Sequence, residues 1–201
     1  MINISLYTYA FVLILVIFFV REQFEHKRLN RINFFVIPVF SLYQFLTNIE
    51  IKNLNDIILL TSIFLVATFV GYFQTISFEI DQQYIDTHYF ITTEENKKAP
   101  ITREVYFVKG GLSYLIGWVA IFMTQILVSL YFHEIQINDV EHELVNELIN
   151  DIVVFLRIDD HKSWWIWELF AVSNYSYYRF LLIKNNQFRK AIISGKASNP
   201  I

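Results

Sequence analysis

The sequence predicts an all-α integral membrane protein with five transmembrane helices, its N-terminus outside the cell and its C-terminus in the cytoplasm. Three observations support this class: long stretches almost free of charge, an alternation of Lys and Arg between successive loops, and a composition that is 55% apolar and 18% aromatic. A helix of a soluble protein keeps a polar face, and these stretches have none. We therefore expect one membrane domain over residues 1–201.

The uncharged stretches have the length that a bilayer requires. A helix rises about 1.5 Å per residue, so roughly 20 apolar residues cross the ~30 Å hydrocarbon layer. Four stretches carry no charged residue, and a fifth carries only Glu168 and Arg179. We predict transmembrane helices over residues 4–20, 32–48, 57–77, 111–132 and 164–183.

The orientation follows from the basic residues, because Lys and Arg near helix ends are retained in the cytoplasm. Residues 21–31, 97–109 and 184–196 hold four Lys or Arg each. The two intervening loops hold only Lys52 in one, and Arg157 and Lys162 in the other. This distribution places the N-terminus outside and the segment 97–109 in the cytoplasm.

A cytoplasmic segment over residues 78–109 is expected to form β-structure. Residues 78–80 and 84–91 are rich in aromatic and β-branched residues and flank a polar turn at residues 81–83. After a charged segment that contains a proline, residues 103–108 are a candidate third strand. The sequence thus predicts a small hairpin or a three-stranded element on the inner membrane face.

An external amphipathic helix is expected over residues 138–157. Asn138 and Glu141 have the spacing of a capping box, and apolar residues recur at helical intervals. Its other face is acidic. We predict that partners bind this acidic face and the cytoplasmic strands, through Glu141, Glu143, Glu147, Tyr84 and Tyr89.

The order of these features resembles that of a known family. A helix and a basic loop precede a helix with an early Pro38, and a third helix runs into the residues 75–80 and a strand at residues 84–85. This order resembles the CcdC-like family of small bacterial membrane proteins, named for an association with cytochrome c biogenesis. The resemblance covers residues 1–130, roughly, and implies a polytopic fold of four or five helices without implying catalytic residues. The long acidic external segment and the length of the β segment depart from the family pattern.

The predicted fifth helix is the most polar one. Ionisable groups inside a membrane are expensive, so we expect Glu168 and Arg179, each about one turn from an edge, to snorkel toward the interfaces. Near the membrane centre, Asn174 is expected to bond to Gln125 or Gln44 on another helix.

No residue pattern indicates catalysis or a cofactor. His133-Glu134 and His142-Glu143 each resemble the start of a zinc-protease helix, but neither has a second His four residues later. The group His142, Glu143 and Glu147 is a weak candidate for a cation, against a solvated acidic face. The chain has no Cys, which excludes disulfides and thiol chemistry.

Three functions from different classes remain. The leading hypothesis is a non-enzymatic membrane accessory protein of the cell membrane, which binds a membrane protein or peptide partner and no nucleic acid. The second is an immunity protein that protects a bacterium from a bacteriocin or toxin, with the acidic helix engaging a cationic peptide. The third is a small transporter or membrane-embedded enzyme that uses the polar fifth helix.

Overall fold

The computed structural model describes residues 6–92, 98–131 and 164–193, which are mostly helical and include one three-stranded antiparallel sheet. The external helix expected over residues 138–157 lies outside these described residues. The elements in chain order are α1 (Leu6–Phe24), β1 (Lys27–Arg28), α2 (Arg31–Asn48), α3 (Leu54–Gln74), β2 (Glu79–Thr92), β3 (Lys98–Lys109), α4 (Gly111–Tyr131), α6 (Trp164–Lys184) and α7 (Asn186–Ile193).

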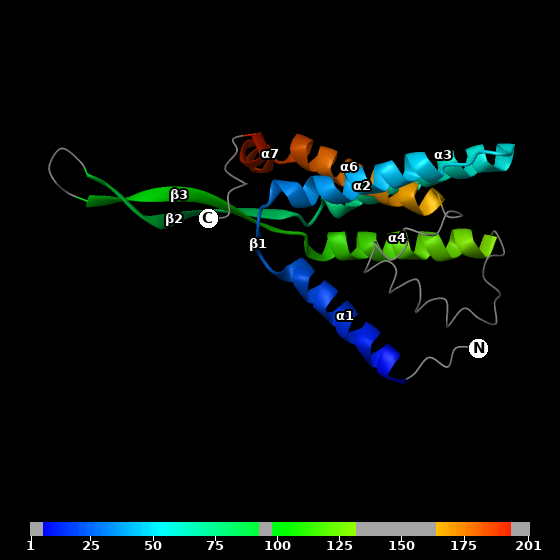
Figure 1. Cartoon of the computed structure of the whole chain (residues 1–201), viewed down its shortest axis with the longest axis horizontal. Helices are drawn as coiled ribbons and strands as arrows, with labels where there is room; N and C mark the ends of the chain where they lie inside the picture. Colours follow the sequence, from blue (N-terminus) through cyan, green and yellow to red (C-terminus); the bar gives the residue numbers. More distant parts are fainter. Residues whose placement is uncertain (1–5, 93–97, 132–163, 194–201) are drawn as a thin grey trace.

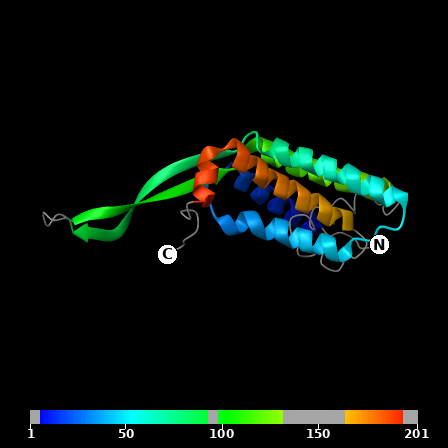
Figure 2. The same cartoon turned by 90° about the horizontal axis from the view of Figure 1, so that it is seen from above.

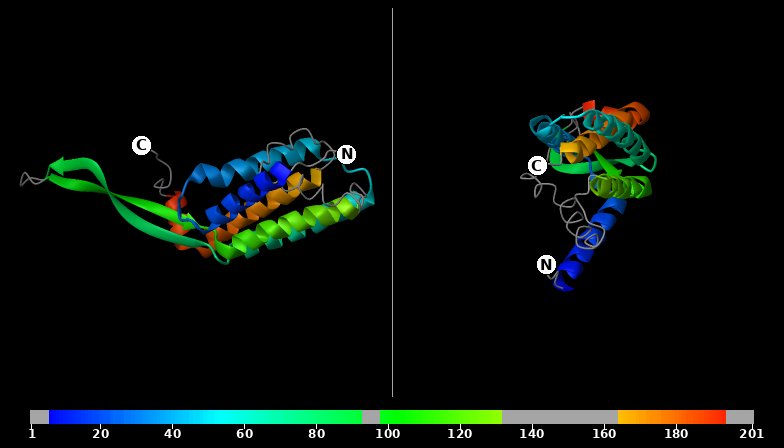
Figure 3. Two further views of the ribbon diagram at one scale, coloured as in Figure 1. Left: turned by 90° about the horizontal axis from the view of Figure 1, so that it is seen from below. Right: turned by 90° about the vertical axis from the view of Figure 1, so that its right-hand side faces the viewer.

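Four helices, α2, α3, α4 and α6, run side by side along the long axis of the molecule (Figure 1). Helix α6 packs against both α2 and α3, and α3 also packs against α4 (Figure 3). Helix α1 diverges at an angle and contacts α4, where the Phe19 and Trp118 rings meet edge to face at 5.5 Å. The core of the bundle therefore forms around α6, whose Leu169 and Phe170 are fully buried.

A close approach of two backbones fixes the contact between α3 and α6. A Cβ atom at Gly71 of α3 would lie 2.5 Å from the carbonyl oxygen of Ser173 in α6 and 2.8 Å from the backbone nitrogen of Tyr177. Only glycine fits, because backbone atoms cannot move aside as a flexible side chain can. Small residues at helix contacts have this role in membrane bundles as well.

Polar groups define several helix ends. The Asn30 side chain accepts a hydrogen bond from the Ile32 backbone nitrogen at the start of α2. At the start of α3, the Asp56 carboxylate accepts from the backbone nitrogens of Lys52 and Asn53, at 2.8 and 3.0 Å. Gly111 begins α4 with a φ of 71°, a conformation that favours glycine.

The strands β2 and β3 form a long antiparallel hairpin, which we call the arm. Their register runs from Glu79 opposite Lys109 to Thr92 opposite Lys98, with an irregularity between Asp86 and Phe90. The turn expected at residues 81–83 is wrong, since these residues continue β2 and pair with residues 105–107. Polar residues fit a strand whose faces are solvated, so polarity alone does not mark a turn there.

The strand expected over residues 103–108 is confirmed as part of β3, which is the centre of the sheet order β1-β3-β2. Because residues 81–83 join the two segments before it into the single strand β2, the third strand of the sheet comes from elsewhere in the chain. The third strand is β1, which comes from the segment after α1 and pairs Lys27 with Val108 and Arg28 with Phe107. A strand of two residues is too short to carry a hydrophobic pattern, so only its pairing identifies it.

Five membrane spans are not supported by helix length and composition. In the described part of the chain, only α3 and α4 are long and apolar enough to cross a membrane. The apolar part of α2, Phe34–Asn48, is too short to cross a membrane. Helix α6 is long enough, but the polar residues Glu168, Asn174 and Arg179 lower its mean hydropathy. The structure thus establishes two candidate spans where the sequence predicted five.

The chain alternates in direction, so its connections gather at the two ends of the bundle. The arm leaves from one end, which we call the arm end, where α1, α3 and α6 finish and α2 and α4 begin (Figure 2). The short helix α7 also lies there. The opposite end holds the connection between α2 and α3.

Candidate functional site

The arm is the most distinctive surface feature of the molecule. Its strands have 14 and 12 residues, and at ~3.3 Å per residue the arm is on the order of 40 Å long. It projects from the bundle along the long axis (Figures 1 and 2). Within the described residues, β2 has a paired neighbour on one side only, and β1 covers the outer side of β3 only at Phe107 and Val108. Most of both strand edges is therefore free of a neighbouring strand.

The base of the arm is built into the bundle. The Leu29 backbone nitrogen donates to the Tyr106 carbonyl oxygen at 2.8 Å, and both side chains are buried. They belong to an apolar cluster that includes Tyr177 and Leu181 of α6 and Phe188 of α7. The direction of the arm is thus fixed by packing at its base.

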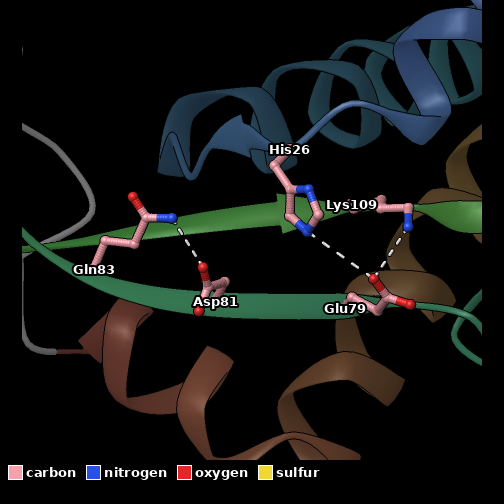
Figure 4. Close-up of polar contacts among 5 residues, drawn as sticks. All are labelled: His26, Glu79, Asp81, Gln83 and Lys109. Carbon is pink, nitrogen blue, oxygen red and sulfur yellow. Dashed lines mark hydrogen bonds and ion pairs between the residues drawn. The ribbon is translucent and has the colours of Figure 1, made fainter.

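Charged and polar side chains line the arm where it leaves this cluster (Figure 4). The Lys109 ammonium lies 3.2 Å from a Glu79 carboxylate oxygen, and the His26 Nε2 atom lies 4.0 Å from the same oxygen. Further out, the Gln83 side-chain nitrogen donates to the Asp81 carboxylate at 2.9 Å. These groups are solvent-exposed or partly so, which makes each interaction worth about 0–1 kcal/mol.

Of the predicted partner-binding residues, the two tyrosines lie on the arm and the three glutamates lie outside the described residues. Tyr84 lies on β2 with 64% of its surface exposed, and its hydroxyl accepts from the Gln82 side chain at 3.0 Å. Tyr89 lies in the irregular part of β2, where three residues stand opposite a single residue of β3. The acidic residues Glu141, Glu143 and Glu147 lie outside the described residues.

Glu168 and Gln125 are among the polar residues buried inside the bundle. Glu168 is 2% exposed and Gln125 is fully buried. Among the described residues, one Glu168 carboxylate oxygen and both amide atoms of Gln125 have no hydrogen-bond partner. The expected snorkelling of Glu168 is therefore wrong, because its side chain is enclosed by the bundle, whereas Arg179 is exposed.

The expected bond between Asn174 and another helix is also wrong. The Asn174 side-chain nitrogen donates to the Phe170 carbonyl oxygen of its own helix at 2.9 Å. Gln44 likewise bonds within its helix, to the Asn48 side chain at 3.2 Å. A side-chain amide in the middle of a helix can donate a hydrogen bond to the backbone carbonyl four residues earlier. This local bond competes with a bond to another helix.

Sequence reasoning missed an apolar groove between α2, α3 and α6, which we call the bundle groove. Its volume is about 830 Å³, within the range of ~300–1,000 Å³ that ligand pockets have. Its walls include Phe35, Val39 and Leu42 of α2 and Phe64 of α3, and Arg179 of α6 lies on its border. The one signal in the sequence was Arg179, a charge in an apolar stretch.

These features define a helical bundle that carries a projecting two-stranded arm. Comparison with protein families, with curated proteins and with solved structures finds no match for this chain. The resemblance to the CcdC-like family therefore stays a prediction. In the described part of the chain, no group of three His, Cys, Asp or Glu side chains is placed to hold a metal ion.

Proposed function

We propose that the protein is a multi-pass membrane protein in which α1, α2, α3, α4 and α6 all cross the bilayer. The exposed apolar side chains on the bundle support this proposal most strongly. Leu46, Phe69 and Leu127, on three different helices, are 64%, 68% and 67% exposed. Soluble monomers rarely expose apolar patches larger than a few hundred Å². A bilayer would cover these side chains.

The polarity of α6 is compatible with a span because of where the helix lies. Twelve of its residues are buried, and these include Glu168, Ser173 and Ser176. Hydropathy counts such residues against insertion, although they would contact protein and not lipid. The central position of α6 thus supports a span that composition alone does not identify.

The proposed orientation places the arm in the cytoplasm. The connections at the arm end carry many Lys and Arg, which include Lys27, Arg28, Lys109 and Lys184. Among the described residues of the opposite end, Lys52 is the only basic residue, and it pairs with Glu50 at 2.6 Å. Retention of positive charge in the cytoplasm would fix this arrangement.

We propose that the activity is non-enzymatic: the arm binds a membrane or cytoplasmic protein, which adds a strand to the free edge of β2. The observation that carries the proposal is the long two-stranded arm, in which the outer edge of β2 has no neighbouring strand among the described residues. An isolated two-stranded hairpin is marginally stable in water, and a third strand would stabilise it. Strand addition is a recurrent mode of peptide recognition.

A truncation of the arm tests this function. Tyr84 and Glu104 are directly opposite in the register, so Asn-Gly can replace residues 85–103 as a two-residue turn. The base of the arm stays intact. A photoreactive amino acid at Gln83 should crosslink a protein in the full-length arm and lose that product in the truncated one. The same probe at Asn55, at the opposite end of the bundle, serves as the control.

The burial of Glu168 favours a second candidate function. A small transporter or membrane-embedded enzyme would depend on an acid inside the bundle. One carboxylate oxygen of Glu168 has no hydrogen-bond partner among the residues that the structure describes. Loss of activity in Glu168→Gln at normal abundance would favour this alternative. The immunity hypothesis, protection from a bacteriocin or toxin, depends on the external acidic helix expected over residues 138–157, which lie outside the described residues.

A further inference from the structure

We propose that the bundle groove holds one anionic phospholipid of the cytoplasmic leaflet, with its headgroup between Arg31 and Arg179 and an acyl chain on the apolar walls. The inference rests on the proposed membrane orientation. It goes beyond the proposed function, because it assigns a ligand to a surface that the arm does not use. The groove is formed by α2, α3 and α6, and the arm is formed by β2 and β3.

The depth of the groove matches one leaflet. It begins near the arm end and extends to Leu42 of α2, about 16 Å above the start of that helix at the helical rise per residue. On the facing helix it extends to Phe64, roughly 15 Å from the end of α3. Both distances match the thickness of one leaflet, which is half of the ~30 Å hydrocarbon layer. An acyl chain from the arm-end leaflet would thus fill the groove without crossing the bilayer centre.

The two arginines lie at the shallow end of the groove. Arg179 borders it about one and a half turns from the end of α6. Arg31 begins α2 and lines an adjacent cavity of about 440 Å³, which shares Phe35 and Val39 with the groove. Tyr178, which also lines the groove, precedes Arg179 in α6. The two arginines therefore border two adjoining cavities at the arm end of the bundle.

Arg31 keeps donors that a headgroup can reach. One terminal nitrogen donates to the Ala191 carbonyl oxygen at 3.4 Å, and the residue is half-buried. A guanidinium group carries five N–H donors, so this single bond to a backbone oxygen does not use them all. A phosphate oxygen is a fitting acceptor, because guanidinium groups bind phosphate through several parallel hydrogen bonds.

In the described part of the chain, no acidic side chain lines either cavity, so none of these residues neutralises the positive charge there. Among the described residues, neither Arg31 nor Arg179 forms an ion pair with a carboxylate. Basic pockets between transmembrane helices on the cytoplasmic side are known binding sites for anionic headgroups. Charge complementarity therefore selects an anionic lipid over a zwitterionic one.

Lipid retention tests the proposal. The full chain is placed in nanodiscs of phosphatidylcholine with 30% phosphatidylglycerol, extracted in mild detergent, and weighed by native mass spectrometry. We expect one retained phosphatidylglycerol. Arg179→Gln should lower its retention about fivefold, which is the effect of ~1 kcal/mol per basic residue near a membrane surface. The matched control is Arg189→Gln, an exposed arginine of α7 outside the groove, which should retain the lipid.

Two further measurements separate the possible outcomes. Leu42→Trp fills the apolar part of the groove and leaves both arginines in place. This variant should also lower lipid retention. In the second measurement, 10 mM inorganic phosphate is added to the original chain, and displacement of the lipid would mean that the site recognises only the anion. Equal retention of phosphatidylcholine, or equal loss in the Arg179 and Arg189 variants, would overturn the lipid proposal. A chain that fails to float with liposomes would overturn the proposed membrane insertion, on which the lipid proposal rests.

Discussion

The Lys109 ammonium and the Glu79 carboxylate form an ion pair of 3.2 Å between two residues that are directly opposite in the sheet. Glu79 is the first residue of β2 and Lys109 is the last residue of β3. The pair therefore joins the two strands at the point where the arm leaves the bundle (Figure 4).

The first prediction concerns this pair. Glu79→Gln should destabilise the arm by less than about 1 kcal/mol, because the Glu79 side chain is 60% exposed and solvent screens the attraction. Hydrogen exchange of the amides at residues 80–83 should become faster, while the bundle stays unchanged. The double variant Glu79→Lys, Lys109→Glu should restore the original rates. No recovery in the double variant would mean that the pair does not contribute.

The second prediction concerns the contact between α3 and α6. Gly71→Ala should destabilise the bundle by about 1–3 kcal/mol, because the added Cβ would meet backbone atoms of Ser173 and Tyr177. Thermal unfolding in detergent measures this loss. Phe69→Leu is the control, since Phe69 lies on the exposed side of the same helix. An equal melting temperature for Gly71→Ala and the original chain would contradict the close approach.

The third prediction concerns the start of α3. Asp56→Ala removes an acceptor for two backbone nitrogens and should loosen the first turn of α3, because those donors lose their partner. Asn55→Ala changes a neighbouring exposed residue and should have little effect. Hydrogen exchange of the Lys52 and Asn53 amides reports the loss directly. Protection that persists in Asp56→Ala would show that the carboxylate is not their acceptor.

The fourth prediction separates the two candidate functions. If the arm carries the function, Glu168→Gln should retain the crosslinked product at Gln83, because the substitution keeps the shape of a buried side chain. It should also unfold at a temperature close to that of the original chain, since Gln and Glu have nearly the same size and shape. Immunoblotting checks the abundance. Loss of the product at normal abundance would argue against the arm as the functional site.

The sequence predicted the long described helices well, because apolar runs of this length have few alternatives, but it missed the short helix α7. The predicted helices over residues 32–48 and 111–132 match α2 and α4 closely in their bounds, at Arg31–Asn48 and Gly111–Tyr131. The strand segment was placed correctly as well. Its pairing was not, because Lys27 and Arg28 join the sheet from a distant part of the chain and carry no pattern of their own.

The burial of polar residues was harder to predict. Periodicity indicates which residues share a face, but α6 contacts other helices on several sides and has no single buried face. Glu168 therefore resembled an interfacial residue in the sequence although the bundle encloses it. The bundle groove depends on the packing of three helices, and no local pattern encodes such a shape.

The most direct test of this account is the accessibility of single cysteines at the two ends of the bundle. The chain contains no Cys, so Asn53→Cys and Thr92→Cys each introduce one thiol, before α3 and at the end of β2. In intact cells, a membrane-impermeant maleimide should label the Asn53 variant and should reach the Thr92 variant only after permeabilisation. Labelling of the Thr92 variant in intact cells would contradict a cytoplasmic arm, and recovery of either variant in the soluble fraction would contradict the membrane bundle.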